Sequence, residues 1–158
     1  MAIFMKYGSI TGAVTEQGHK NWIELTSFQW GVGRGITQAH GTGTTREASN
    51  PSISEITATK PQDASSPNLW LDAVAGQLNN LVTIEFTTTT KNKTETYLKY
   101  ELTNTGLSGY SISSGGDRPS ESISLNFSKV SWTFTPTGSD TSGTPQTVGY
   151  DLSLMQTT

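Results

Sequence analysis

The stretch "SGGDRPSESISLNFSKVSWTF" (residues 114–134) joins a flexible, charged corner to a long segment that alternates between apolar and small polar residues. Apolar residues occupy every other position from Ile123 to Phe127, and the alternation resumes in a new phase from Val130 to Phe134. Alternation with a period of two is typical of a β-strand. The slip in phase indicates that this strand bends and changes its buried face, as a β-bulge allows.

A second segment changes phase in the same way. In "NWIELTSFQWGV" (21–32), Ile23 and Leu25 lie at odd positions. The later apolar residues, Phe28, Trp30 and Val32, lie at even positions. The change therefore lies near Thr26–Ser27. Two long strands that each exchange faces midway indicate a strongly coiled sheet that closes on itself, because closure requires bends. The sequence predicts an all-β fold, a small closed or nearly closed antiparallel β-barrel.

Other segments complete this predicted sheet. Four of them carry strand patterns, at residues 52–60, 81–86, 97–102 and 147–152. The polar stretch "TTTTKNKTET" (87–96) joins the middle two as a hairpin. The stretch "RGITQAHGTGTTREASNP" (34–51) has no apolar rhythm, which predicts a long extended loop at about residues 37–51. Loops of this length within a compact domain are often functional.

One segment, "SSPNLWLDAVAGQ" (65–77), predicts a short α-helix at about residues 67–75. Ser66 is the expected N-cap, Pro67 takes the first helical position and Gly76 ends the helix. Apolar residues recur at helical spacing, so one face of the helix should pack against the barrel. The expected packing residues are Leu69, Trp70, Ala73 and Val74.

Composition and charge limit the class of protein. The chain has 158 residues, enough for a single domain over residues 1–158, and its net charge is only −3. There is no basic stripe for nucleic acid, and no stretch approaches membrane-spanning length. The absence of cysteine excludes disulfides and thiolate chemistry. The N-terminal residues show no secretory signal pattern, so we expect a protein that folds in the cytoplasm.

We find no pattern that predicts catalysis, a metal or a cofactor. The two histidines, His19 and His40, lie at opposite ends of a predicted long strand, and His19 is better explained as a turn residue. No GxSxG nucleophile motif occurs, and "GTGTT" (41–45) lacks both a lysine and a following helix for a phosphate site. The chain is therefore not expected to be an enzyme.

The glycine-rich corner and the tryptophans admit two interpretations each. The corner has good turn chemistry, and Arg118 could pair with Asp117 or Glu121. The tryptophans are expected to anchor the core, but they could also form a sugar-binding platform. The rival hypothesis is therefore a monomeric glycan-binding β-sandwich. The tryptophans concerned are Trp22, Trp30, Trp70 and Trp132.

Three quoted stretches together resemble the Hcp family, the tube-forming proteins of bacterial type VI secretion systems. They are "GSITGAVTEQGHKNWIELTSFQWGVGRGI" (8–36), "ATKPQDASSPNLWLDAVAGQ" (58–77) and "GYSISSGGDRPSESISLNFSKVSWTFTPTG" (109–138). The resemblance implies hexameric rings that stack into a tube, which a contractile sheath propels with a spike protein and effectors in its lumen. A tail-tube protein of a phage-like contractile particle is the nearest alternative.

The resemblance also directs attention to two surface segments. The long loop is the expected ring-stacking or subunit-interface element, with candidate residues Gly41, Thr42, Gly43, Thr44, Thr45, Arg46 and Glu47. The corner is a candidate turn or subunit contact, formed by Gly115, Gly116, Asp117, Arg118 and Pro119. The implied partners are other copies of the chain, sheath, spike and effector proteins, with no nucleic acid, membrane insertion or cofactor. The implied localisation is cytoplasmic first, and then extracellular after export.

Overall fold

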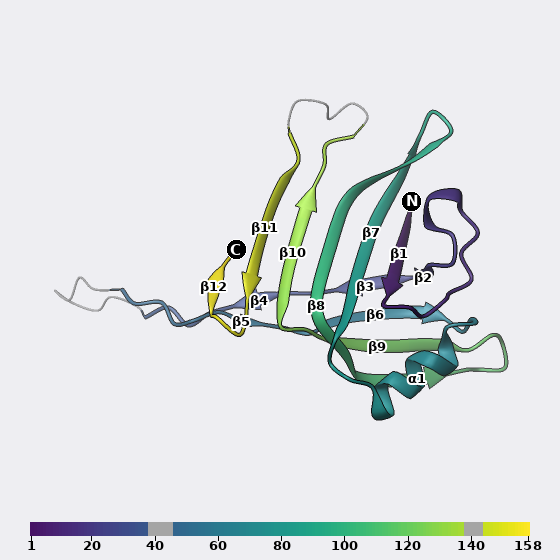
Figure 1. Cartoon of the computed structure of the whole chain (residues 1–158), viewed down its shortest axis with the longest axis horizontal. Helices are drawn as coiled ribbons and strands as arrows, with labels where there is room; N and C mark the ends of the chain where they lie inside the picture. The colour runs from purple at the N-terminus through teal and green to yellow at the C-terminus, as the bar shows by residue number, and fades with distance from the viewer. Residues whose placement is uncertain (38–45, 138–143) are drawn as a thin grey trace.

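The computed structural model describes residues 1–37, 46–137 and 144–158 (Figure 1). Its elements in chain order are β1 (Ala2–Tyr7), the 3₁₀ helix η1 (Gln17–His19), β2 (Ile23–Leu25), β3 (Ser27–Gln29), β4 (Val32–Gly33), β5 (Ser52–Ile53), β6 (Ile56–Pro61), α1 (Ser66–Ala75), β7 (Asn80–Thr90), β8 (Lys93–Ser113), β9 (Ser120–Asn126), β10 (Lys129–Phe134), β11 (Gln146–Asp151) and β12 (Gln156–Thr157). The predicted fold class is confirmed, because antiparallel strands dominate and one short helix accompanies them.

Ten of the strands form two connected sheets, and β4 and β5 pair separately. The first sheet has the order β12-β11-β10-β8-β7-β1-β2, and the second has the order β8-β9-β6-β3. Strand β8 belongs to both, because its first part pairs with β7 and β10 and its last part pairs with β9. In Figure 1 the strands β7, β10 and β11 and the first part of β8 stand upright, whereas β6 and β9 of the second sheet run across them. The core lies between the two sheets and includes Met5, Ile23, Ile84, Leu102 and Ile123.

The two predicted phase slips are the points where strands pass from one sheet to the other. Thr26 separates β2, which pairs with β1, from β3, which pairs with β6. Phe127 and Ser128 separate β9 in the second sheet from β10 in the first. Each segment must expose a different parity to the core once its partner sheet changes, which explains the slips. Closure of the two sheets into a barrel stays a prediction.

The predicted hairpin at residues 87–96 is confirmed, but its strands are longer than expected. Strands β7 and β8 pair as far as Thr90 and Lys93, which leaves only Lys91 and Asn92 in the turn. Both turn residues have positive φ, 50° and 63°, as a two-residue turn of type I′ requires. The threonine-rich stretch is therefore strand rather than loop, in keeping with the β propensity of threonine.

The helix is present, but its predicted orientation is wrong in part. Leu69 is fully buried and Ala73 packs against the core, whereas Trp70 and Val74 are 53% and 62% exposed. The N-cap is Ser65 and not Ser66, which is the first helical residue. Two polar contacts explain the rotation. Ser66 donates a hydrogen bond to Glu121 (2.7 Å), and Asp72 accepts one from Tyr7 (2.5 Å).

A buried polar network ties α1 to the second sheet. The Lys60 ammonium lies 2.5 Å from a carboxylate oxygen of Glu121, and neither side chain is exposed to solvent. Lys60 also reaches Asp63 at 3.0 Å, and Tyr110 donates a hydrogen bond to the other Glu121 oxygen. The network satisfies charges that would be costly to bury alone.

Three tyrosines predict a loss of stability at high pH. Burial is the main cause that raises the pKa of Tyr7, Tyr100 and Tyr110, and hydrogen bonds to Asp72 and Glu121 raise those of Tyr7 and Tyr110 further. The unfolded chain loses tyrosine protons near pH 10 and the folded chain only above it. The contribution of these tyrosines to stability should therefore be constant below about pH 10 and fall as the pH rises further.

Denaturant unfolding followed at several pH values, with tyrosinate absorbance as the titration signal, checks this prediction. Tyr7→Phe is the matched variant, because it removes one shifted hydroxyl and keeps the ring. It should lose less stability between pH 9 and pH 11 than the wild type. Equal losses in the two proteins would contradict the assignment to Tyr7.

Candidate assembly surfaces

The predicted long loop is part of a projecting two-stranded arm. Residues 31–37 and 46–54 run antiparallel, with β4 paired to β5 and a further bridge between Ile36 and Ala48 (Figure 1). The candidate Glu47 is fixed in this pairing, because its backbone N–H donates to Thr37 Oγ1 at 2.8 Å. Arg46 is exposed at the end of the described arm, and the candidates Gly41 to Thr45 lie outside the described residues.

The glycine-rich corner is the turn between β8 and β9, and all but its last residue are exposed. Gly116 has φ of +112°, a conformation that favours glycine. Ser114 accepts a hydrogen bond from the Gly116 N–H (3.1 Å) and donates one to the Asp117 carbonyl (2.7 Å), so it sets the turn. Arg118 pairs with neither expected carboxylate and donates to the Gln62 carbonyl at 2.8 Å, while Glu121 points inward to Lys60.

The outer face of the second sheet is covered by small hydroxyl side chains. One row of register partners crosses all four strands, from Ser111 through Ser122 and Thr59 to Ser27. Thr59 Oγ1 lies 2.6 Å from Ser27 Oγ, so a hydrogen bond joins the last two residues of the row. The charged residues of β6 and β9, Lys60 and Glu121, alternate to the opposite face and are buried. We call this surface the hydroxyl face.

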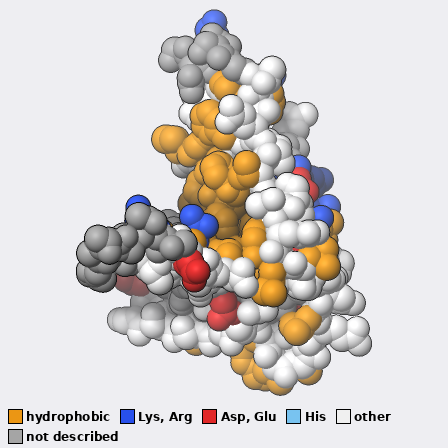
Figure 2. Space-filling view, turned by 90° about the vertical axis from the view of Figure 1, so that its left-hand side faces the viewer, with side chains coloured by type: hydrophobic (Ala, Val, Ile, Leu, Met, Phe, Trp, Pro, Cys, Tyr) orange, Lys and Arg blue, Asp and Glu red, His pale blue; other side chains and the backbone are white. Residues whose placement is uncertain are grey.

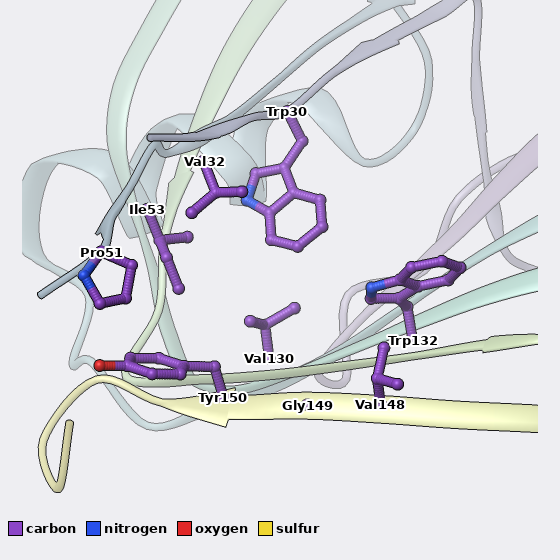
Figure 3. Close-up of a pocket in the computed structure, with 9 residues that line it drawn as sticks. All are labelled: Trp30, Val32, Pro51, Ile53, Val130, Trp132, Val148, Gly149 and Tyr150. Atoms are coloured by element: carbon purple, nitrogen blue, oxygen red, sulfur yellow. The ribbon is translucent and has the colours of Figure 1, made fainter. Parts of the chain in front are cut away.

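A hollow lined by apolar side chains separates the base of the arm from β10 and β11. Figure 2 shows apolar side chains gathered at the centre of this side of the molecule. We call the hollow the arm pocket and define it by Trp30, Val32, Ile53, Trp132, Val148 and Tyr150. Figure 3 shows the arm residues facing those of β10 and β11 across the open space. The indole N–H of Trp30 is buried and has no hydrogen-bond partner among the described residues.

The four tryptophans do not form one platform. Only Trp30 and Trp132 meet in a pocket, whereas Trp22 packs edge-on to His19 and Trp70 projects from α1. The expectation that all four anchor the core is wrong for Trp70, which is more than half exposed. The glycan-binding hypothesis therefore loses the continuous aromatic surface on which it depended.

His19 is a buried residue that contacts two carboxylates, and not only a turn residue. Its ring nitrogens lie 2.6 Å from carboxylate oxygens of Glu16 and Glu85, and its ring stacks on Phe4. The hydrogen bond with His19 is the main cause that lowers the pKa of the Glu16 carboxyl. These contacts hold the segment before β2 against the first sheet. Within the described ranges, no group of three or more metal-ligating side chains is present and no helix is long and apolar enough to span a membrane.

A projecting arm, a hydroxyl-covered sheet face and an open apolar pocket define a structural subunit that acts through its surfaces. The profile of a family described as "Type VI secretion system effector, Hcp" matches residues 4–134 of this chain. The match covers more than half of the 158 residues, and the chain therefore belongs to the Hcp family of type VI secretion. Hcp proteins are secreted structural tube proteins and not enzymes.

Solved structures agree with this assignment. A structure described as a type six secretion system protein is 29% identical, with 99% of each chain covered and a TM-score of 0.89. Hcp1 from Salmonella typhimurium is 25% identical, with 99% of this chain and 98% of that chain covered and a TM-score of 0.76. Hcp2 from the same organism is 26% identical, with coverages of 96% and 95% and a TM-score of 0.69. No curated protein matches the chain.

Proposed function

We propose that this tube protein assembles head to tail into hexameric rings, and that the rings stack into an inner tube whose lumen carries effectors. A contractile sheath propels the tube, and a spike protein caps it. The protein folds in the cytoplasm and leaves the cell when the system fires. The family match favours this role over the phage-like particle, because the matched family is one of type VI secretion.

The hydroxyl face is the observation that carries the proposal. Four adjacent strands present serine and threonine side chains in register, with Ser122 near the middle of the face. Such a face is wetted by water, and it lacks fixed charges that would hold a charged cargo in place. A lumen needs this property, since an effector must enter the tube and also leave it. The opposite face of the same sheet is buried and contributes Ile56, Ile123 and Leu125 to the core, so the two faces have separate roles.

Ring formation is the first expected result. Purified protein examined by native mass spectrometry and negative-stain electron microscopy should give rings of about six subunits, the number implied by the family. A strictly monomeric protein over a wide concentration range would contradict the proposal. The measurement needs no ligand or partner, so it tests the assembly directly.

The orientation of the hydroxyl face predicts a labelling pattern. The wild-type chain has no cysteine, so Ser122→Cys introduces one thiol on this face. In assembled tubes a small maleimide dye should react with it, whereas a bulky polyethylene-glycol maleimide should react at least tenfold more slowly than in dissociated subunits. Lys99→Cys, at a position of the first sheet that is 40% exposed, is the matched control and should react equally in both states. Equal reactivity at position 122 would place the face outside the lumen.

The arm is the expected stacking element. Replacing residues 41–46 with a short Gly-Ser linker should leave the ring and the circular-dichroism spectrum unchanged and shorten or abolish the stacks seen by electron microscopy. The remaining arm is held by its own backbone pairs, including Ser49 N–H to the Gly35 carbonyl at 2.8 Å. Filaments of unchanged length and yield after this replacement would contradict a role of residues 41–46 in stacking.

A further inference from the structure

Six of the exposed large apolar side chains of the described residues lie on two different surfaces. Among the described residues, thirteen large apolar side chains are exposed. Four of them follow one another along the outer side of α1 and the turn after it, at Trp70, Leu71, Val74 and Leu78. We call this row the α1 ridge. Val32 and Val148, which are 65% and 51% exposed, belong to the second surface, the arm pocket.

The α1 ridge is exposed because polar contacts decide which side of the helix faces the core. Asp72 accepts hydrogen bonds from Tyr7 and Asn80, and Ser66 contacts both Lys60 and Glu121. These anchors turn the apolar positions of the ridge toward solvent. Monomeric soluble proteins rarely expose a continuous apolar row of this kind, and such surfaces mark interaction sites.

The arm pocket requires an apolar occupant. The residues that line it are all uncharged, and they include Trp30, Trp132 and Tyr150. A charged group placed there would lose its hydration without gaining an ionic partner. The unpartnered indole N–H of Trp30 also calls for a hydrogen-bond acceptor, such as a backbone carbonyl at the end of a helix.

The two surfaces lie on different sides of one chain, which suits a second copy as the occupant. Helix α1 lies at the lower right of Figure 1, whereas β4, β5 and β11 lie toward the left. A head-to-tail contact joins two different patches and can close a ring, whereas a two-fold dimer would use a single patch twice. A stable interface buries roughly 800 Å² per partner. A fully buried aromatic side chain supplies about 150–250 Å², and Trp70 is only 53% exposed, so the four apolar side chains of the ridge supply part of this area and the residues around them must supply the rest.

We propose that the α1 ridge of one copy packs into the arm pocket of the next copy, and that this contact closes the ring. The proposal rests on the proposed ring assembly and assigns the residues that form it. The apolar side chains of the ridge insert between the arm and β10–β11 of the neighbouring copy, and they cover Trp30 and Trp132. Each subunit uses its ridge on one side and its pocket on the other.

Disulfide trapping tests the contact, because the wild-type chain contains no cysteine. Three double variants combine Val148→Cys with Trp70→Cys, Leu71→Cys or Val74→Cys. These three ridge positions span about one turn of α1, so together they test each residue of the ridge that could lie opposite Val148. At least one of them should form a covalent ladder up to the hexamer on mild oxidation. The single variants should give no ladder, and a mixture of the two matching single variants should stop at dimers. Lys99→Cys with Leu71→Cys is the control pair and should not cross-link.

A charge exchange provides an independent readout. Val74→Lys and Val148→Asp are each expected to raise the protein concentration needed for ring formation at least tenfold. The double variant should lower that concentration most of the way back to the wild-type value. Both positions are exposed in the single chain, so the variants should fold. Rings of wild-type protein without any ladder or charge rescue would overturn this contact and leave the proposed function intact. Absence of rings in the wild type would instead overturn the proposed function.

Discussion

Replacing Lys60 with methionine is expected to lower the free energy of unfolding by roughly 3–5 kcal/mol, the range found when one partner of a buried ion pair is removed. The Lys60 ammonium and the Glu121 carboxylate are both fully buried and lie 2.5 Å apart. Methionine has a similar length, so the cavity term is small. The loss comes from the Glu121 carboxylate, which is left in the interior without a cation.

Urea unfolding followed by tryptophan fluorescence measures this loss. Lys99→Met is the matched control, because Lys99 forms an exposed ion pair with Glu101 at 2.9 Å. Exposed pairs contribute about 0–1 kcal/mol. Adding Glu121→Gln to Lys60→Met should restore at least half of the loss, since the amide removes the charge and still accepts a hydrogen bond. A cost below about 1 kcal/mol for Lys60→Met would show that the pair is not buried as described.

Asp72→Ala should be the second most damaging change, with a loss of roughly 2–3 kcal/mol from donors left without an acceptor in the interior. The Tyr7 hydroxyl is fully buried and donates to Asp72 at 2.5 Å, and the Leu107 N–H and the Asn80 amide point to the same carboxylate. The variant also releases the contact that fixes the rotation of α1. Ring assembly should therefore weaken together with stability.

Thermal unfolding measures the loss of stability in Asp72→Ala, and hydrogen exchange across residues 66–75 measures how firmly α1 is held. Asp117→Ala is the control, because the Asp117 side chain is exposed at the corner and should change stability by less than about 0.5 kcal/mol. Tyr7→Phe is expected to lower the free energy of unfolding by less than Asp72→Ala does, because it removes the hydroxyl itself and leaves no buried hydroxyl without an acceptor. Normal protection of α1 in Asp72→Ala would show that the apolar contacts of Leu69 hold the helix without the carboxylate.

The candidate surfaces were predicted from the sequence only in part. The corner around Gly116 was identified as a turn, because two glycines followed by proline carry a local conformational signal. The arm was found as a long loop, but its paired base was missed, since the bridge between Ile36 and Ala48 joins residues without apolar alternation. The arm pocket was missed altogether. Trp30 and Trp132 are 102 positions apart, and nothing in either strand pattern shows that they meet.

Two features of this protein were determined by the sequence itself: its antiparallel strands and the points where two of them change sheets. Alternation and its slips are local, so the segments around Thr26 and Ser128 carry their own signal. The tertiary structure decided which helix face is buried and which charges are paired. Tyr7 and Asp72 are 65 positions apart, and Lys60 and Glu121 are 61 apart. Only the folded chain brings such partners together, and their hydrogen bonds leave the α1 ridge facing solvent.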